Sequence, residues 1–408
     1  MNRFYARHRL DISPADLGAA LVGLAASDHE AAGADVEKVW SRDGSALACY
    51  SVRSGFHLLL SALHLTRGSE VLFSAVTHPD MPRLAEHHGL VPVPVDLDPA
   101  TLSPHPEALL RCINGRTRMM VVAHLFGGHV DLAPLAAVSR REGLVLVEDC
   151  AQAFQGLPDT GDPLADVSMF SFGILKTTTA LGGAMLTVRD RWLLDRMRAI
   201  QRRWPAQKRA AHLKRIAQTA AFVALTRPYP YSLLAGACSA LGIGFDHLVN
   251  SAARAFPAGS TADLVRRLRL RPGAPLLKLL ERRLRTFDRD RLAARAASGE
   301  QLAGMLPPGL HLGGFALDHT HWLFPVVSDR PDEMIQAARA AGFDAARSAS
   351  SVKAIAAPLG RPELEPLCAL DVMSRLVFLP AYPELPPGSL ESLASVLEGH
   401  ETHAHISR

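Results

Sequence analysis

Asp149 and Lys176 are the two residues whose types and positions best suit chemistry. The apolar run Leu144–Val147 predicts a buried strand, and Glu148 and Asp149 follow it at its carboxyl end. The next predicted strand, Val167–Phe172, is followed by Lys176 in a loop rich in threonine and glycine. Open α/β sheets bind their ligands at this edge, where a lysine amine can act as a nucleophile or carry a proton. Taken singly, each residue is better explained without chemistry, Lys176 as a solvated loop lysine and Asp149 as a strand-end residue that caps a turn.

The elements that must position these residues alternate between short apolar strands and amphipathic helices. Helical patterns lie at Phe56–Leu65 and at Leu132–Glu142, and Gly143 ends the second. The strand predictions are Val71–Phe73, Val91–Val95, Met119–Ala123, Leu144–Val147, Val167–Phe172 and Ala184–Val188. This alternation predicts an α/β fold with a large, mostly parallel sheet covered by helices.

The chain divides into five predicted regions. They are an N-terminal helical segment (1–43), the large α/β domain (44–203), a helical insertion that is first basic and then apolar (204–258), linking helices (259–305) and a small C-terminal α+β domain (306–408). Within the last region, Trp322–Val327 and Leu376–Leu379 predict strands. Pro331 opens a helix that Gly342 closes, and Ser389–Leu397 predicts a final helix.

Composition limits the class of protein. A chain of 408 residues with 48% hydrophobic residues can bury two cores, and its net charge of +4 does not call for a nucleic-acid partner. The five cysteines are widely spaced without a CxxC pair, so they predict neither a disulfide framework nor a metal site. The N-terminus lacks the apolar core of a signal peptide. We therefore expect a cytoplasmic protein with reduced thiols.

Two linked motifs carry a resemblance to a known family. The first runs from Glu148 to Gly156 and reads EDCAQAFQG; the second runs from Ser171 to Lys176 and reads SFGILK, with Gly182-Gly183 behind it. In this order they resemble the DegT/DnrJ/EryC1/StrS family of pyridoxal-phosphate-dependent sugar aminotransferases, which have the type I fold. The resemblance is clear over residues 45–190 and weaker over 320–400. It implies that the large domain binds pyridoxal 5'-phosphate.

The resemblance also implies roles for individual residues. Lys176 would hold the cofactor as a Schiff base and move a proton, while Asp149 would pair with the pyridine nitrogen. Gln152 would donate to the 3'-oxygen of the ring. His78, in place of the family's aromatic residue, would stack on the ring; the alternative is a solvated loop histidine. Ser171 would supply a hydroxyl to the phosphate.

The phosphate and the substrate would be held at two further places. Ser54, Gly55 and Phe56 would open a helix whose N-terminus cradles the phosphate, with Phe56 replacing the family's threonine. Arg347 would face an anionic group of the substrate, because its planar fork suits carboxylate or phosphate. A surface arginine is the alternative for Arg347.

The chain departs from the family pattern after the lysine. The family's G-x-N-x-R-M loop, which contributes an asparagine to the partner subunit's phosphate site, has no counterpart here; Arg271-Pro272 stands in its place without an asparagine. The insertion 204–258 precedes it. Three interpretations stay open for this insertion: a structural cap, a lid over a bulky substrate, and, through residues 196–245, peripheral contact with the inner face of a membrane.

The expected function is transfer of an amino group from glutamate or glutamine to a keto-sugar, nucleotide-linked, or to a related bulky ketone. The expected partners are these small molecules and a second copy of the chain, and a metal ion or nucleic acid is not expected. Another pyridoxal-phosphate reaction, such as elimination or carbon–carbon chemistry, is the first alternative. A non-catalytic regulator that binds the cofactor is the second.

Overall fold

The protein is built on one twisted sheet of seven strands, in the order β1-β8-β7-β6-β5-β2-β4. The computed structural model describes residues 3–242, 245–246, 248–249, 259–307 and 309–398; parts of the predicted insertion and of the last predicted region therefore lie outside the described residues. Strands β2 (Glu70–Ser74), β4 (Val91–Val95), β5 (Thr117–Ala123), β6 (Val145–Asp149) and β7 (Val167–Ser171) pair in parallel. Strand β8 (Ala184–Val188) is antiparallel to both of its neighbours. The α/β prediction is confirmed.

The six predicted strands are mostly apolar because both faces of the sheet are covered by helices. Val71 and Phe73 pack in one apolar cluster, whereas Leu72 between them packs in another. Helices α3 (Val52–Leu63), α4 (Asp80–His87) and α7 (Arg191–Gln201) contribute to the first layer; α5 (Pro106–Cys112) and α6 (Ala133–Glu142) contribute to the second. Strand β1 (Ala46–Cys49), at the sheet's edge, was not predicted, because four residues rich in alanine give little strand signal.

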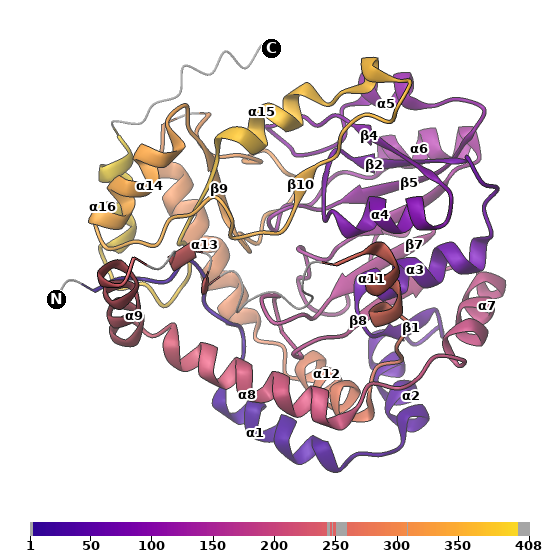
Figure 1. Ribbon diagram of the computed structural model, residues 1–408, viewed down its shortest axis with the longest axis horizontal. Coiled ribbons are helices and arrows are strands. Elements are labelled where there is room, and N and C mark those ends of the chain that lie inside the picture. Colours follow the sequence, from indigo (N-terminus) through magenta and orange to yellow (C-terminus); the bar gives the residue numbers. More distant parts are fainter. Residues whose placement is uncertain (1–2, 243–244, 247, 250–258, 308, 399–408) are drawn as a thin grey trace.

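The C-terminal part forms a smaller unit beside the sheet (Figure 1). Its antiparallel pair β9 (Phe324–Val327) and β11 (Leu376–Leu379) packs with α14 (Pro331–Ala340) and α16 (Ser389–Leu397) around a separate core. Helix α15 (Leu367–Arg375) leads into β11, and the short β10 (Lys353–Ala354) pairs with β3 (Val76–Thr77) of the large unit. Helix α13 (Arg289–Met305) packs on α16.

The first residues do not follow the prediction of a helical segment. Helices α1 (Pro14–Val22) and α2 (His29–Trp40) form as expected, but residues 3–13 run extended, and Tyr5 bridges to Phe343 of the small unit. The reason is a buried ion pair. Arg7 donates to Asp344 at 2.7 Å, and holding this pair requires the chain to lie along the small unit.

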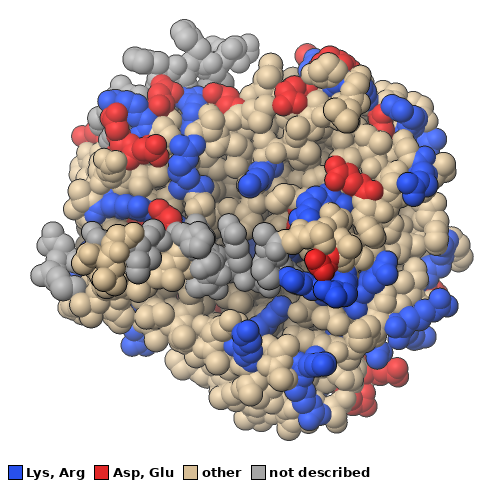
Figure 2. Space-filling view, in the orientation of Figure 1, with Lys and Arg blue, Asp and Glu red and all other residues tan. Residues whose placement is uncertain are grey.

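The insertion is helical where the structure describes it. Helix α8 (Arg209–Leu225) lies under the sheet domain, and its Ile216 packs in the core with Ala20 of α1. Helix α9 (Pro228–Ala240) packs on the N-terminal segment through Tyr231, whose hydroxyl donates to the buried Asp344. Figure 2 shows more Lys and Arg than Asp and Glu over the lower half of this face, where α8 and α11 (Thr261–Leu268) lie. None of the described helices is both long and apolar enough to cross a membrane.

Candidate active site

The predicted site residues meet at one edge of the sheet. Strand β1 is antiparallel to β8, which is antiparallel to β7, so β1, β6 and β7 all point the same way. Their carboxyl ends deliver the N-terminus of α3, Asp149 and Ser171 to the same edge. Lys176 follows in the loop between β7 and β8, held by its backbone N–H, which donates to Gly173 O at 2.9 Å.

Lys176 is an unusually reactive amine in this setting. Its Nζ lies 4.0 Å from the ring centroid of Trp322, and the indole N–H of Trp322 donates to the neighbouring Leu175 carbonyl at 2.8 Å. Burial lowers the pKa of Lys176 to about 8; Asp149 opposes this shift and Arg53 adds to it. A substantial fraction of the amine is therefore neutral near physiological pH, which nucleophilic attack on a carbonyl requires.

Asp149 is a buried carboxylate aimed at the same place. It is 7% exposed, and the Ala151 N–H donates to its Oδ1 at 3.0 Å. Burial raises the pKa of Asp149, while that backbone hydrogen bond and the charge of Lys176 lower it. The adjacent Glu148 faces the other way, because it accepts from His124 at 2.8 Å and from the Asp162 N–H at 2.9 Å. Asp149 thus remains as the carboxylate that can hold a cationic group.

His78 lies close enough to the lysine for the charge of Lys176 to act on its ring. Burial lowers its pKa to about 4, and Arg53 and Lys176 both contribute. Its Nδ1 accepts the N–H of Asp80 at 3.2 Å, so the ring is oriented and neutral. Asp80 in turn pairs with Arg53 at 2.7 Å. A neutral, oriented imidazole is suited to stacking, as predicted for His78.

The helix that was expected to begin at Ser54–Phe56 begins earlier. The N-cap of α3 is Ser51, whose hydroxyl accepts the Ser54 N–H at 3.1 Å. Ser54 itself donates its hydroxyl to Leu268 O, and Phe56 is fully buried against Phe73. The placement of these residues at the mouth of the helix is therefore wrong, because Ser51 supplies the cap.

Gly55 serves packing at this point. A Cβ there would lie 2.8 Å from the side chain of Leu186 on β8, so only glycine lets α3 approach the sheet this closely. The helix mouth consists instead of Ser51, Val52 and Arg53. Nearby, the partly exposed Ser171 lies at the end of β7, and its hydroxyl is 3.5 Å from the Gly173 N–H.

Two arginines missed by sequence reasoning stand at this helix mouth. Arg53 occupies the first turn of α3, and burial lowers its pKa, with nearby Arg215 adding to the effect. Arg215 comes from the inserted α8. It donates to the hydroxyl of Tyr50 at 2.9 Å and to Leu181 O at 3.0 Å, and so joins the start of α3 to the Lys176 loop. Arginine next to a helix N-terminus is a typical anion site.

The structure is compatible with the predicted role of Gln152 but not with that of Arg347 as a residue beside the lysine. The Phe126 N–H donates to Gln152 Oε1 at 2.8 Å, so the side-chain amide is held with its nitrogen as the remaining donor, as its predicted role requires. Arg347 donates to Ser374 O and lies 3.9 Å from Asp332, both in the small unit. It is not among the described residues that line the cavity beside Lys176, and its substrate role stays a prediction without support from the geometry.

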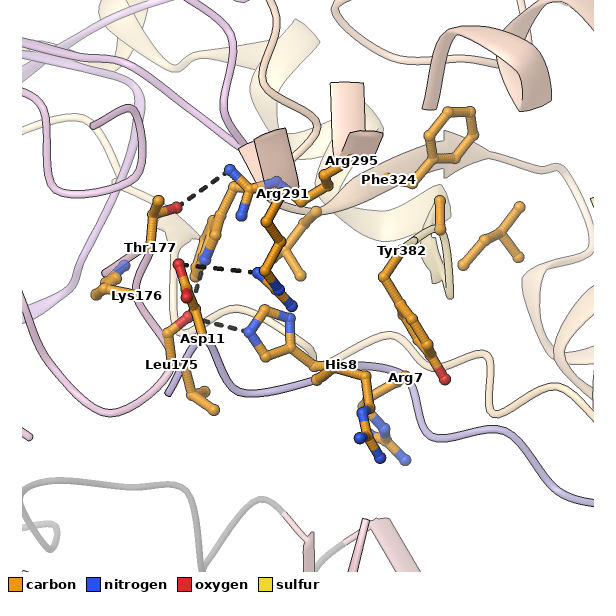
Figure 3. A pocket seen from close by; sticks show the side chains of 15 residues that line it. Arg7, His8, Asp11, Leu175, Lys176, Thr177, Arg291, Arg295, Phe324 and Tyr382 are labelled. Carbon is orange, nitrogen blue, oxygen red and sulfur yellow. Dashed lines mark hydrogen bonds and ion pairs between the residues drawn. The ribbon is translucent and has the colours of Figure 1, made fainter. Parts of the chain in front are cut away.

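The N-terminal segment lines part of the cavity beside Lys176 (Figure 3). The ring of His8 donates through Nε2 to Leu175 O at 3.0 Å, and the Thr178 N–H donates to Asp11 at 2.7 Å. Burial lowers the pKa of His8 to about 4, so it is neutral and acts as a fixed donor. Residues distant in sequence thus fix the conformation of the lysine loop.

A cluster of three histidines lies elsewhere, at His311, His319 and His321. The rings stack: His319 and His321 are 4.1 Å apart with planes inclined by 31°, and His311 stacks on Phe324 at 4.5 Å and 6°. One ring nitrogen of each histidine nevertheless lies within 4.8 Å of the other two. Among the described residues, His311 Nε2, His319 Nε2 and His321 Nδ1 are buried without a hydrogen-bond partner.

Residues 37–218 match the model of the DegT/DnrJ/EryC1/StrS aminotransferase family. GDP-perosamine synthase of Caulobacter vibrioides is 32% identical over 160 residues, which are 38% of this chain and 43% of that protein. The chain thus matches less than half the length of the curated relatives.

The solved structures confirm the type I aminotransferase fold over nearly the whole chain. Sugar aminotransferase CalS13 from Micromonospora echinospora has a TM-score of 0.67 at 20% identity, covering 96% of this chain and 98% of its own. NtdA from Bacillus subtilis, solved with bound cofactor PMP, has a TM-score of 0.66 at 18% identity, covering 95% and 83%. At these identities the likeness establishes the fold.

The residues present fit the cofactor of this family. Lys176 offers a largely buried amine of lowered pKa, Asp149 a buried carboxylate, His78 a neutral ring, and the start of α3 a phosphate cradle with Arg53. Pyridoxal 5'-phosphate, when bound, supplies an electron sink for carbon acids and amines.

Proposed function

We propose that the protein is a pyridoxal-phosphate-dependent aminotransferase that moves an amino group from an amino acid to a keto-sugar. The observation that carries the proposal is the amine of Lys176, with a pKa of about 8, opposite the buried Asp149 at the edge where α3 begins. A solvated loop lysine would need neither the burial nor the buried carboxylate.

The chain's own groups divide the work. Lys176 would hold the cofactor and move a proton at its Nζ. Asp149 would bind a protonated ring nitrogen, and Gln152 would donate to the ring oxygen. His78 would bind against the ring and exclude water. The N–H groups at the start of α3, with Arg53 and Arg215, bind the phosphate.

A sugar acceptor, nucleotide-linked, and glutamate or glutamine as donor are the finer parts of the proposal. They are supported by the family of residues 37–218 and by relatives described as a GDP-perosamine synthase and a sugar aminotransferase. A homodimer is likewise proposed from the family.

One experiment tests the core of the proposal. Protein purified with the cofactor should absorb in the visible region, and borohydride should fix the cofactor to the peptide containing Lys176. Adding glutamate or glutamine should then convert the cofactor to its amine form, and keto-sugars should restore it. Attachment at Lys278 or Lys353, or no conversion by any amino acid, would contradict the proposal.

A further inference from the structure

Arg295 on α13 is a buried cation that pairs directly with no carboxylate among the described residues. Its side chain is 6% exposed. It donates through Nε to Thr320 O at 2.9 Å and through Nη2 to the Thr177 hydroxyl at 3.2 Å, both neutral groups. Among the described residues no carboxylate lies within ion-pair distance of it. A buried charge without a partner costs several kcal/mol, so its presence requires a compensating role.

The surroundings compensate for the charge of Arg295 only at longer range. Arg291, on the same helix, takes up the carboxylate of Glu384 at 2.9 Å and lies 3.8 Å from Asp11. Asp11 is also paired with Arg283. Burial lowers the pKa of Arg295 to about 10 and Arg291 adds to that, while the charges of Asp11 and Glu384 oppose the shift. Both local carboxylates are therefore paired with other arginines and do not bond Arg295 directly.

Arg295 is attached to the same two segments as the reactive amine. It bonds Thr177, which follows Lys176 in the chain, and Thr320, two residues before the Trp322 on which Lys176 Nζ lies. Lys176 and Arg295 line one cavity, and Figure 3 shows the Arg295 side chain directed toward the lysine loop. An anion bound by this guanidinium would lie beside the amine.

We propose that Arg295 binds an oxyanion of the substrate, a carboxylate or a phosphate, beside Lys176. The inference rests on the proposed function and names the chemical group that the substrate presents. An amino-acid donor carries the carboxylate, and a nucleotide-linked acceptor carries the phosphate. The planar fork of arginine suits either group, and charge-assisted hydrogen bonds are the strong ones in a buried cavity.

The test measures anion binding on the holoenzyme, in which the cofactor fills its own phosphate site. Thermal unfolding is followed with succinate, with inorganic phosphate, and with chloride at the same ionic strength. One of the two oxyanions should raise Tm by a few degrees in a saturable manner. Arg295→Gln and Arg295→Met should abolish this rise, while Arg295→Lys should weaken the anion affinity about tenfold. Arg285→Gln, at an exposed position of α12 (Ala274–Arg285), should respond like the wild type.

A second measurement compares Arg295 with Arg283, a buried arginine whose ion pairs stabilise the fold. Arg283 is equally buried but pairs with Asp11 and Asp16. Without added anion, Arg295→Met should change Tm by no more than about 2 °C, whereas Arg283→Met should lower it by roughly 5 °C or more.

The proposal is overturned if neither oxyanion stabilises the wild type more than chloride does, or if the Arg295 variants retain the full response. It is also overturned if Arg295→Met lowers Tm as much as Arg283→Met. Anion binding requires no turnover, so a protein that binds the oxyanion through Arg295 but transfers no amino group would refute the proposed function alone. A response to succinate identifies the carboxylate, and a response to phosphate identifies the phosphate.

Discussion

The reactivity of Lys176 should follow a titration near pH 8 and move in opposite directions when its two charged neighbours are removed. A pKa of about 8 in place of 10.5 corresponds to about 3 kcal/mol against the charged amine. At pH 7 the neutral fraction is then about 9%, roughly 300 times that of an ordinary lysine. Asp149→Asn removes the charge that raises the pKa, so the midpoint should fall below 8. Arg53→Gln removes a charge that lowers it, so the midpoint should rise.

The assay is the pH dependence of cofactor attachment to the apoprotein. Pyridoxal phosphate is added in brief pulses at pH 6 to 11, trapped with borohydride, and the labelled peptides are quantified. Lys278, exposed and paired with Asp35, provides the internal control, because its hydrogen bonds raise its pKa. A Lys176 midpoint that coincides with that of Lys278, or a midpoint that rises in Asp149→Asn, would refute the electrostatic reasoning.

Three further outcomes are expected. Arg215→Gln should weaken cofactor affinity about tenfold in an absorbance titration and reduce its salt dependence, whereas Lys214→Gln on the exposed side of α8 should not. His124 holds the pKa of Glu148 at about 2 despite burial. The ionised Glu148 therefore stabilises the fold above about pH 4.5, and this stabilisation is lost as the pH falls from about 4.5 to 2. Glu148→Gln should flatten the dependence of Tm on pH in that window. Tyr231→Phe should lower the free energy of unfolding by about 1.5–3 kcal/mol in denaturant titrations, because it removes a donor to buried Asp344.

The sheet could be predicted from the sequence because strands buried on both faces appear as continuous apolar runs. Met119–Ala123 falls within β5, and Ala184–Val188 coincides with β8. The start of α3 could not be placed in the same way. Ser51 and Ser54 are both plausible caps by residue type, and only the extended backbone of Ser51 decides between them. The sequence signal for the earlier start is that Ser51, like Ser54, is a residue type that caps helices.

Arg215 and Arg295 could not have been found from sequence. The chain has 44 lysines and arginines, and most arginines on helices are exposed. What distinguishes these two is burial against segments more than thirty residues away, such as Leu181 for Arg215 and Thr177 for Arg295. Tertiary packing alone creates that difference. Arg347, by contrast, was selected by its place in a motif, and its side chain turns to the small unit.

The insertion acts on the site by two routes, which favours a structural role over membrane contact. Directly, α8 places Arg215 against the hydroxyl of Tyr50 at the start of α3. Indirectly, Arg9 donates to the carbonyl of Thr226 at the end of α8, at 2.9 Å, and this hydrogen bond holds the N-terminal segment in place. His8 of the same segment hydrogen-bonds the lysine loop at Leu175 O. Since the resemblance implies an asparagine loop that this sequence lacks, we propose that Arg215, a cation from the insertion, supplies charge at the phosphate site instead. Loss of cofactor affinity in Arg215→Gln without a change of molar mass in solution would agree with this proposal.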